Sequence, residues 1–497
     1  MAAPAFRCKG AFWQTHILFL PCGNAKPNRN CHMHCMLRLS PLIAVLLAGC
    51  AELSTPPATL SPQALGLTEA RAPAFAAGAW WRALGDPALD RLVAQALAAN
   101  PRLTLADAKV RAAEAGRAVA AAGGGPNVGF AYSRNRQRYS ADSIYPPPIG
   151  GSWQTLEEIG LKLDWQVDLW GQVSERVAAE AGQVAAARFD AELARQWLSA
   201  EVTAQYLALR VAKAQQALAA EAVALARSRD KQVQWRVKAG LSDPASLAGT
   251  RASLAAAEAS LAPWDGEVTA TRAALAALTV QPLPAIPADT PTAWPEWTLD
   301  TAGLSLSAIS RRPELAAARQ GVEAAAHRVR AARADFYPDL SLSLLLGLTS
   351  LNPATLFDAA SRELGVTPAL SLPLYRAGGL QGRLDAEQAA YAAAVGQYNQ
   401  TLLDVAGQCA SALAKTQAAA RADAAAADAA RGAQQQARAA EVLFAAGLAA
   451  RDDALAAAEG ALSARQKWLS VRGERLQAQL ALVRALGEVP ESPAEKP

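Results

Sequence analysis

The chain has 497 residues, of which 52% are hydrophobic and 19% are charged, and its mean hydropathy is close to zero. This balance is too apolar for an intrinsically disordered protein and too polar for a bundle of transmembrane helices. Five of the 48 basic residues and none of the 44 acidic residues precede position 50, so 43 basic and 44 acidic residues follow it. Such an even balance lacks the basic excess of a nucleic-acid-binding protein, so we expect no nucleic acid as a partner.

Residues 1–49 differ in composition from the rest of the chain, because they contain all three Met, three of the four His and four of the six Cys. From Met36, one arginine is followed by a short apolar stretch and then by small residues, which is the organisation of a secretory signal peptide. The apolar stretch is shorter than the roughly 20 residues that a membrane-spanning helix needs. We therefore expect residues 1–49 to be an N-terminal extension and signal peptide, with translation starting at Met33 or Met36.

Residues 47–50 resemble the lipobox of bacterial lipoproteins, in which the cysteine becomes the acylated N-terminus. The resemblance implies diacylglycerol and N-acyl chains on Cys50 and, because Ala51 and not Asp follows, sorting to the outer membrane. The alternative is a plain signal peptide with a chance cysteine. Residues 31–35 hold two Cys and two His, but their spacing matches no common zinc site and they precede the cleavage point. We expect no metal and no cofactor beyond the acyl chains.

Beyond Cys50, the chain has only one further cysteine, Cys409, and one histidine, His327. These residues cannot build a Cys/His metal cage, and a Ser-His-Asp triad would depend on His327 alone. His327 lies in an alanine-rich helical stretch with no serine nearby, which favours a surface or interface histidine. A hydrolase that uses carboxylates only remains an alternative, but no convergent acidic pair is evident. The sequence therefore predicts that the protein is not an enzyme.

The chain also contains a tandem duplication. Asn100, Pro101 and Leu103 are matched at an offset of 212 residues by Arg312, Pro313 and Leu315, and each group opens an alanine-rich segment. The turns at 238–241 and 445–448 correspond at an offset of 207. These correspondences predict a lipidated N-terminal and equatorial region (50–99), a first repeat (100–280), a proline-rich linker (281–311), a second repeat (312–487) and a C-terminal tail (488–497).

Each repeat is expected to contain one very long helix. No proline occurs between Pro148 and Pro244 or between Pro373 and Pro490, so a helix can run from about Gly171 to Ala239, roughly 100 Å. Gly240 supplies a left-handed stop, and an N-cap with a first-turn proline follows at 243–244. Each repeat also has a shorter helix, at 100–122 or 312–336, and a later helix of nearly 40 residues. We expect these two helices to stack end to end beside the very long helix.

Four segments alternate between apolar and polar residues, as strands do. They start at Val128, Leu161, Leu340 and Val366, the last continuing to Leu374, with loops at 139–158 and 350–363. Segments of about ten residues with one apolar face are typical of outer-membrane barrels, although a soluble half-buried sheet is the alternative. Four strands cannot close a barrel, and open edges in lipid leave backbone groups unsatisfied. Three chains would supply twelve strands.

The motifs at 80–92, 100–103, 311–315 and 334–340 resemble the signatures of the TolC-type outer-membrane factors, most closely the NodT-like lipoprotein branch that serves resistance-nodulation-division (RND) efflux pumps. The resemblance covers almost everything after Cys50. It implies a mixed α + β membrane protein: a homotrimer with a twelve-stranded outer-membrane β-barrel, four strands per chain, continuous with a periplasmic α-helical barrel. It further implies a passive efflux duct, lipid-anchored in the outer membrane, which works with a periplasmic adaptor and an inner-membrane RND pump.

The resemblance also implies roles for two groups of residues. The tip turns would contact the adaptor through Lys238, Gly240, Leu241 and Ser242 and through Gly447, Leu448 and Ala449. Asp453, with Asp452 beside it, matches an aspartate of the periplasmic gate, and Ala456 stands where some members have a second. Arg451 would pair with a neighbouring acid to lock the closed state. The alternative for these aspartates is a solvated first turn of a helix.

Two other functions stay open from the sequence. One is a periplasmic structural coiled-coil lipoprotein, and the other is the outer-membrane component of a type I-like secretion system. The four alternating segments argue against the first.

Overall fold

The computed structural model describes residues 58–61, 79–142, 144–287, 294, 309 and 312–486. The chain divides into two units, Met1–Thr55 and Pro56–Pro497, and every described residue belongs to the second. The predicted acylation site Cys50, the tail 488–497 and most of the linker 281–311 lie outside the described residues. Within the described part, no helix combines the length and apolar character that crossing a membrane requires.

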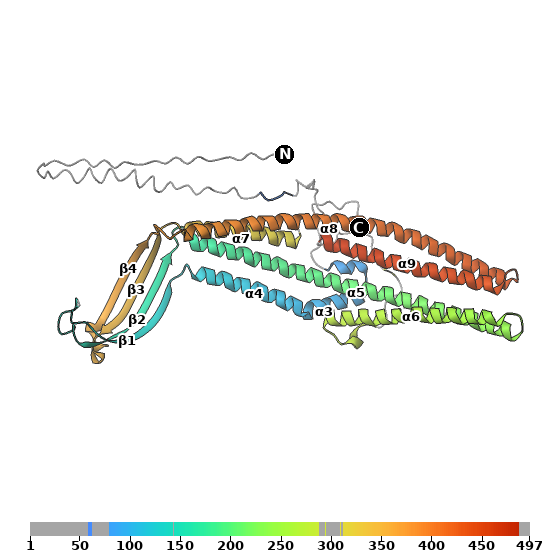
Figure 1. Ribbon diagram of the computed structural model, residues 1–497, viewed down its shortest axis with the longest axis horizontal. Helices are drawn as coiled ribbons and strands as arrows, with labels where there is room; N and C mark the ends of the chain where they lie inside the picture. Colours follow the sequence, from blue (N-terminus) through green and yellow to red (C-terminus); the bar gives the residue numbers. More distant parts are fainter. Residues whose placement is uncertain are drawn as a thin grey trace, which may run out of the picture. The chain divides into compact units, whose positions relative to one another are not determined.

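The long helices and the strands occur in the same order in the two halves of the chain (Figure 1). Two elements precede the first half, η2 (Trp80–Leu84) and α3 (Pro87–Ala99). The first half then contains α4 (Pro101–Ala122), β1 (Asn127–Arg138), β2 (Trp153–Val167), α5 (Gln172–Lys238), α6 (Pro244–Thr279) and η3 (Leu283–Ala285). The second half contains α7 (Pro313–Ala334), β3 (Asp339–Ser350), η5 (Pro353–Thr355), η6 (Ala359–Ser361), β4 (Arg362–Ser371), α8 (Gly379–Ala445) and α9 (Arg451–Leu486). Three helices correspond between the halves, α4, α5 and α6 in the first and α7, α8 and α9 in the second, and they have 22, 67 and 36 residues in each.

Local chemistry fixes the helix ends where the sequence predicts them. The side chain of Asn100 accepts a hydrogen bond from the backbone of Arg102 at 3.0 Å and so caps α4. Asp243 caps α6 in the same way, and both helices have proline in the first turn. Gly240 ends α5 with φ of 69°, a left-handed conformation that favours glycine.

The helices lie side by side along their lengths (Figure 1). Helix α5 contacts α4, α6, α7 and α9, and α8 contacts α7 and α9. At one junction the Asn100 amide donates to the carbonyl of Leu278 at 2.8 Å, which joins the start of α4 to the end of α6. At the equivalent junction the Arg312 guanidinium donates to the carbonyl of Ala485 at 2.7 Å, between α7 and α9. The expected end-to-end stacking is thus confirmed.

The main apolar core lies around the first of these junctions. It joins η2 and α3 to α5, α6 and α9 through side chains that include Trp81, Leu89, Leu198 and Leu275. A second core beside the other junction includes Leu315, Leu402, Cys409 and Leu482. Alanine-rich helices bury little area per residue, so these two clusters of larger side chains concentrate the hydrophobic stabilisation at mid-length.

The four strands form one antiparallel sheet in the order β1-β2-β3-β4, which leaves β1 and β4 as edges. Several boundaries differ from prediction, and one of them is the start of β4 at Arg362, inside the predicted loop 350–363. Strand β2 begins at Trp153, inside the predicted loop 139–158, because residues 153–158 pair with β1 although their sequence does not alternate. Strand β4 ends at Ser371, so Leu372 and Leu374 lie beyond it, where no partner residue continues the ladder. Pro368 lies in β4, an edge position that tolerates its missing N–H.

Candidate functional site

The sheet has two faces of opposite chemistry, which the strand register defines. We call the first the apolar face, and its members are Val128, Phe130, Tyr132, Ile159, Leu161, Leu163, Trp165, Val167, Leu340, Leu342, Leu344, Leu346, Leu348, Leu364, Val366, Pro368 and Leu370. Many of these side chains are exposed in the single chain, with Phe130 at 68% and Leu364 at 76%. A contiguous apolar surface of this kind requires a partner surface or lipid.

The dimensions of the apolar face fit a membrane. Leu340 to Leu348 span about 26 Å along the strand, close to the apolar band of about 25 Å in transmembrane barrels. Aromatic residues lie near its helical end, where Trp165 donates to the carbonyl of Gly124 at 3.0 Å and Trp170 stacks on Tyr337 at 4.9 Å. Aromatic side chains at such positions favour the membrane interface.

The opposite face of the sheet is mostly polar or small, with Leu156 and Leu345 as its large apolar exceptions. It carries Ser133, Asn135, Glu158, Lys162, Asp164, Gln166, Ser341, Ser343, Thr349 and Glu363. Hydrogen bonds cross this face between strands, as from Ser343 Oγ to Asp164 Oδ1 at 2.7 Å. A sheet with one apolar and one hydrated face can line an aqueous passage on its polar side.

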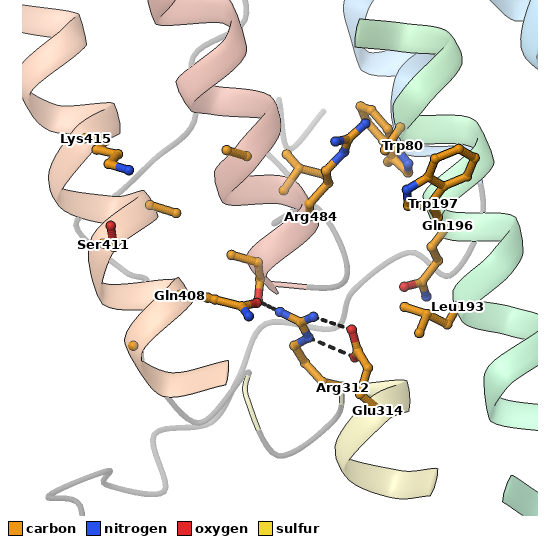
Figure 2. A pocket seen from close by; sticks show the side chains of 16 residues that line it. Trp80, Leu193, Gln196, Trp197, Arg312, Glu314, Gln408, Ser411, Lys415 and Arg484 are labelled. Atoms are coloured by element: carbon orange, nitrogen blue, oxygen red, sulfur yellow. Dashed lines mark hydrogen bonds and ion pairs between the residues drawn. The ribbon is translucent and has the colours of Figure 1, made fainter. Parts of the chain in front are cut away.

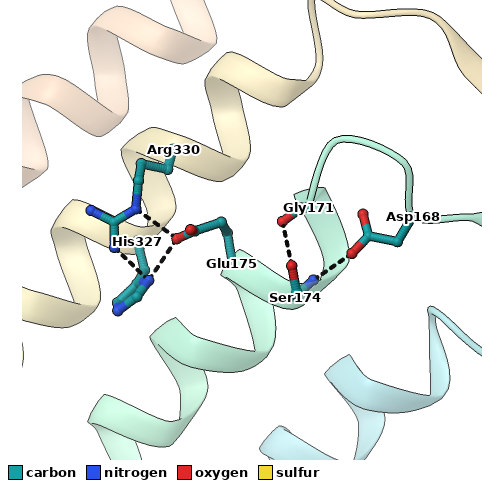
Figure 3. Close-up of polar contacts among 6 residues, drawn as sticks. All are labelled: Asp168, Gly171, Ser174, Glu175, His327 and Arg330. Atoms are coloured by element: carbon teal, nitrogen blue, oxygen red, sulfur yellow. Dashed lines mark hydrogen bonds and ion pairs between the residues drawn. The ribbon is translucent and has the colours of Figure 1, made fainter.

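A polar cluster joins the sheet to the helices where β2 leads into α5 (Figure 3). Asp168 accepts hydrogen bonds from the backbones of Val173 and Ser174 at 3.0 and 2.9 Å. Burial raises the pKa of the Asp168 carboxyl, but these hydrogen bonds outweigh it and leave the pKa below its ordinary value. The charged form is therefore favoured, and it fixes the start of α5 relative to β2.

His327 lies in the same region and bridges two helices (Figure 3). Its Nδ1 lies 2.6 Å from Glu175 Oε2 of α5, and Arg330 of α7 donates to the same oxygen at 2.8 Å. Burial raises the pKa of Glu175, but the hydrogen bonds from His327 and Arg330 outweigh it and lower the pKa. The predicted interface role of His327 is confirmed by these contacts.

A cavity of about 590 Å³ lies at the junction of α7 and α9, with walls from α5 and α8 (Figure 2). Arg312 lies at its edge, held between the carbonyl of Ala485 and the carboxylate of Glu314. Trp80 and Trp197 form part of the lining. Because Arg312 is fully paired and closes the helix junction, its arrangement serves the fold rather than catalysis.

The two predicted tip turns lie at the ends of the helical hairpins α5–α6 and α8–α9, remote from the sheet (Figure 1). Gly240 and Gly447 both have left-handed backbones, with φ of 69° and 73°. Leu241 and Leu448 follow them and are 71% and 76% exposed. Two apolar side chains held outward at equivalent turns form a surface suited to a protein partner. The other predicted contact residues, Lys238, Ser242 and Ala449, belong to the same turns.

The predicted gate residues lie in the first turn of α9. Asp453 is exposed and accepts a hydrogen bond from the backbone of Ala450 at 3.3 Å. Arg451 lies 3.6 Å from Glu441 and over the ring of Phe444, both in α8, so its ion pair stays within one hairpin.

Asp452 instead joins the two hairpins. It pairs with Arg236 of α5 at 2.9 Å and accepts from Gln232 at 3.4 Å. The sequence did not indicate Arg236, because 216 residues separate it from Asp452 and no repeat equivalence links them. The sequence offers one signal for Arg236: it is a basic residue within one helical turn of a predicted tip.

Among the described residues, no group of three or more His, Cys, Asp or Glu side chains is placed to hold a metal ion.

Comparison with known proteins gives a consistent result. The family model described as outer membrane efflux protein matches residues 92–280 and 304–488. The multidrug resistance outer membrane protein MdtP of Escherichia coli K12 is 31% identical over 376 residues, 72% of this chain and 77% of the relative. The putative multidrug resistance outer membrane protein MdtQ of the same strain is 28% identical over 467 residues, covering 90% and 96%.

Solved structures agree. VceC, an outer membrane protein of Vibrio cholerae, has a TM-score of 0.74 and 28% identity and covers 83% of this chain and 99% of its own. The CmeC outer membrane channel of Campylobacter jejuni has a TM-score of 0.77 and covers 89% of this chain and 95% of its own. At 21% identity it shows the fold alone. These likenesses do not favour a structural lipoprotein, a secretion component or an enzyme. The chain belongs to the outer membrane efflux protein family and is a passive channel protein of the bacterial outer membrane.

Proposed function

We propose that three copies of this chain form a single exit duct for small molecules. The observation that carries the proposal is the sheet: two edge strands, β1 and β4, flank a four-stranded sheet with one apolar and one polar face. In lipid, unpaired edges cost several kcal/mol for each unsatisfied backbone group. Pairing β4 of each copy with β1 of the next closes a twelve-stranded barrel with the apolar face toward lipid.

The helices continue the duct into the periplasm. Each chain contributes two 67-residue helices and two stacked pairs, so three chains give a tunnel twelve helices around. The recurrence of the 22, 67 and 36-residue helices supports an origin by tandem duplication, with repeats at 100–280 and 312–487 joined by the linker 281–311. Helices η2 and α3 belong to a region around mid-length, where the main core lies.

The duct works as the outer part of a tripartite efflux system. A periplasmic adaptor contacts the tip turns through Leu241 and Leu448, and an inner-membrane RND pump supplies the energy and the cargo. Acyl chains on Cys50 anchor the chain in the outer membrane, and no other cofactor takes part. The multidrug resistance names of the relatives support drug-like small molecules as cargo.

At the periplasmic end, Asp452 and Asp453 form the gate. Three copies of Asp453 near a symmetry axis repel anions and attract cations. The pair of Arg236 with Asp452 holds the two hairpin tips together in the closed state, while Arg451 braces the α8–α9 turn against Glu441.

The test uses the full acylated chain, purified from outer membranes. We expect a trimer that resists dissociation until heated, and ion conductance when it is inserted into a planar lipid bilayer. The Asp453→Ala variant should conduct more in the closed state and lose block by added cations. A monomeric, water-soluble chain that keeps its full strand content would contradict the proposal.

A further inference from the structure

The apolar face of the sheet ends in a row of arginines. The register continues this face along β1 into Arg134, Arg136 and Arg138, and along β4 into Arg362. All four lie at the end of the sheet away from the helices, because β1 ends at Arg138 and β4 begins at Arg362. We call these four residues the arginine rim.

The arginine rim starts where the apolar band stops. Arg134 follows Tyr132 at the next same-face position of β1, and Arg362 precedes Leu364 in the same way on β4. Arg362 lies opposite Leu348, at the top of the leucine row of β3. The rim therefore occupies the level at which an apolar lipid tail gives way to a headgroup.

The rim carries a surplus of positive charge. Glu157 is the one acidic strand residue on this face; its side chain is 6% exposed and pairs with Arg134 at 3.2 Å. Arg136 lies over the ring of Trp153 with its guanidinium carbon 5.8 Å from the ring centroid, and Arg138 donates to the carbonyl of Gly151 at 3.4 Å. No hydrogen bond or ion pair joins the Arg362 side chain to another residue of the part of the chain that the structure describes. Three guanidinium groups per chain are thus without a carboxylate.

We infer that the arginine rim binds the phosphates of a glycolipid in the outer leaflet of the outer membrane, with a headgroup of the diphosphorylated lipid A type. Arginine holds phosphate through two parallel hydrogen bonds, and basic clusters beside an apolar band attract anionic headgroups. The apolar face below the rim would receive the acyl chains of the same lipid. Trp153, against Arg136, gives the amphipathic ring that favours this interface.

The inference rests on the proposed barrel, which turns the apolar face toward lipid. In a closed barrel, β4 of one copy lies beside β1 of the next, so Arg362 of one chain and the β1 arginines of its neighbour share one headgroup layer. Each trimer then has three equivalent sites. A single chain supplies only the two separate edges of such a site.

The test is native mass spectrometry of the detergent-purified full chain titrated with diphosphoryl lipid A, dephosphorylated lipid A or phosphatidylglycerol. We expect up to three diphosphoryl lipids per trimer and binding at least about tenfold tighter than for the other two lipids. The triple variant Arg136→Gln, Arg138→Gln, Arg362→Gln should lose that preference, while the Arg134–Glu157 pair stays intact. The matched control is Lys162→Gln, which removes one positive charge from the polar face of the same sheet.

Equal binding of all three lipids, or an unchanged preference in the triple variant, would overturn the inference. If the triple variant fails to assemble, the single Arg362→Gln variant applies. The triple Arg→Lys variant should keep only part of the binding, because it retains the charge but not the paired hydrogen bonds. The same spectra report the number of chains. Trimers without lipid preference contradict the inference alone, whereas monomers that still prefer diphosphoryl lipid A contradict the proposed duct and, with it, the sharing of the site between copies.

Discussion

At the residue scale, Asp86 is one of the few buried carboxylates among the described residues. It is buried at the start of α3, accepts from Tyr206 Oη at 2.6 Å and lies 3.2 Å from Arg210. Burial, followed by the hydrogen bond to Asp86, raises the pKa of Tyr206, so the phenol stays protonated at any physiological pH. Asp86 thus ties the equatorial helix α3 to α5 in the middle of the main core.

We expect Asp86→Ala to lower the free energy of unfolding by about 3 to 5 kcal/mol, because it removes the carboxylate from a buried ion pair with Arg210. Tyr206→Phe should cost less, about 1 to 2 kcal/mol, since it removes one hydrogen bond. Asp107→Ala is the control, because its pair with Arg195 is exposed and should contribute less than about 1 kcal/mol. Denaturant unfolding measures all three, and similar losses for Asp86→Ala and Asp107→Ala would contradict this assignment.

Glu175 gives a prediction on pH. Its pKa is lowered in the folded chain, so its contribution is complete above the unfolded value of about 4.3 and is lost as the pH falls toward the folded value. The thermal midpoint of the wild type should exceed that of Glu175→Gln at pH 7, and the gap should shrink below about pH 4. Glu192→Gln, an exposed change on the same helix, should show little difference at either pH. A gap that widens in acid would refute the role of Glu175.

At the element scale, helix ends were predictable and strand ends less so. The limits of α5 follow from Gly171 and Gly240, whose effect is local to the backbone. The start of β2 depends on pairing with β1, as in the contact of Arg134 with Glu157, and no local pattern in residues 153–158 reveals it. The alternating arginines of β1 are visible in the sequence, but only the register shows that Arg362 shares their face.

The proposed gate shows the same limit across elements. The sequence indicated Asp452 and Asp453 through a family resemblance, but the partner Arg236 lies in another hairpin and emerges only when α5 and α9 are side by side. We predict that Arg236→Ala loosens the tips and raises closed-state conductance in planar bilayers. Arg227→Ala is the matched control, because its pair with Glu258 at 3.0 Å stays within the α5–α6 hairpin. Equal conductance of the two variants would remove Arg236 from the gate.

At the scale of the whole molecule, the family is established, and the assembly into a trimer can be tested by substitutions in the sheet. Leu344 lies at the centre of the apolar face, while its neighbour Ser343 lies on the polar face and bonds Asp164. Neither side chain contributes to the two apolar cores that stabilise the helices. Substitutions at these two positions therefore separate the membrane role of the sheet from the stability of the helical part.

We predict that Leu344→Arg prevents trimer assembly in the outer membrane and Ser343→Arg does not. An arginine facing lipid at mid-membrane depth costs about 2 to 4 kcal/mol per chain, and a trimer would carry three. At position 343, the same side chain faces water on the polar side and can pair with Asp164. The measurements are the fraction of heat-resistant trimer in outer-membrane extracts and the helical circular dichroism of each variant. If both variants assemble equally well, the apolar face does not meet lipid, and the closed twelve-stranded barrel is wrong even though the helices are intact.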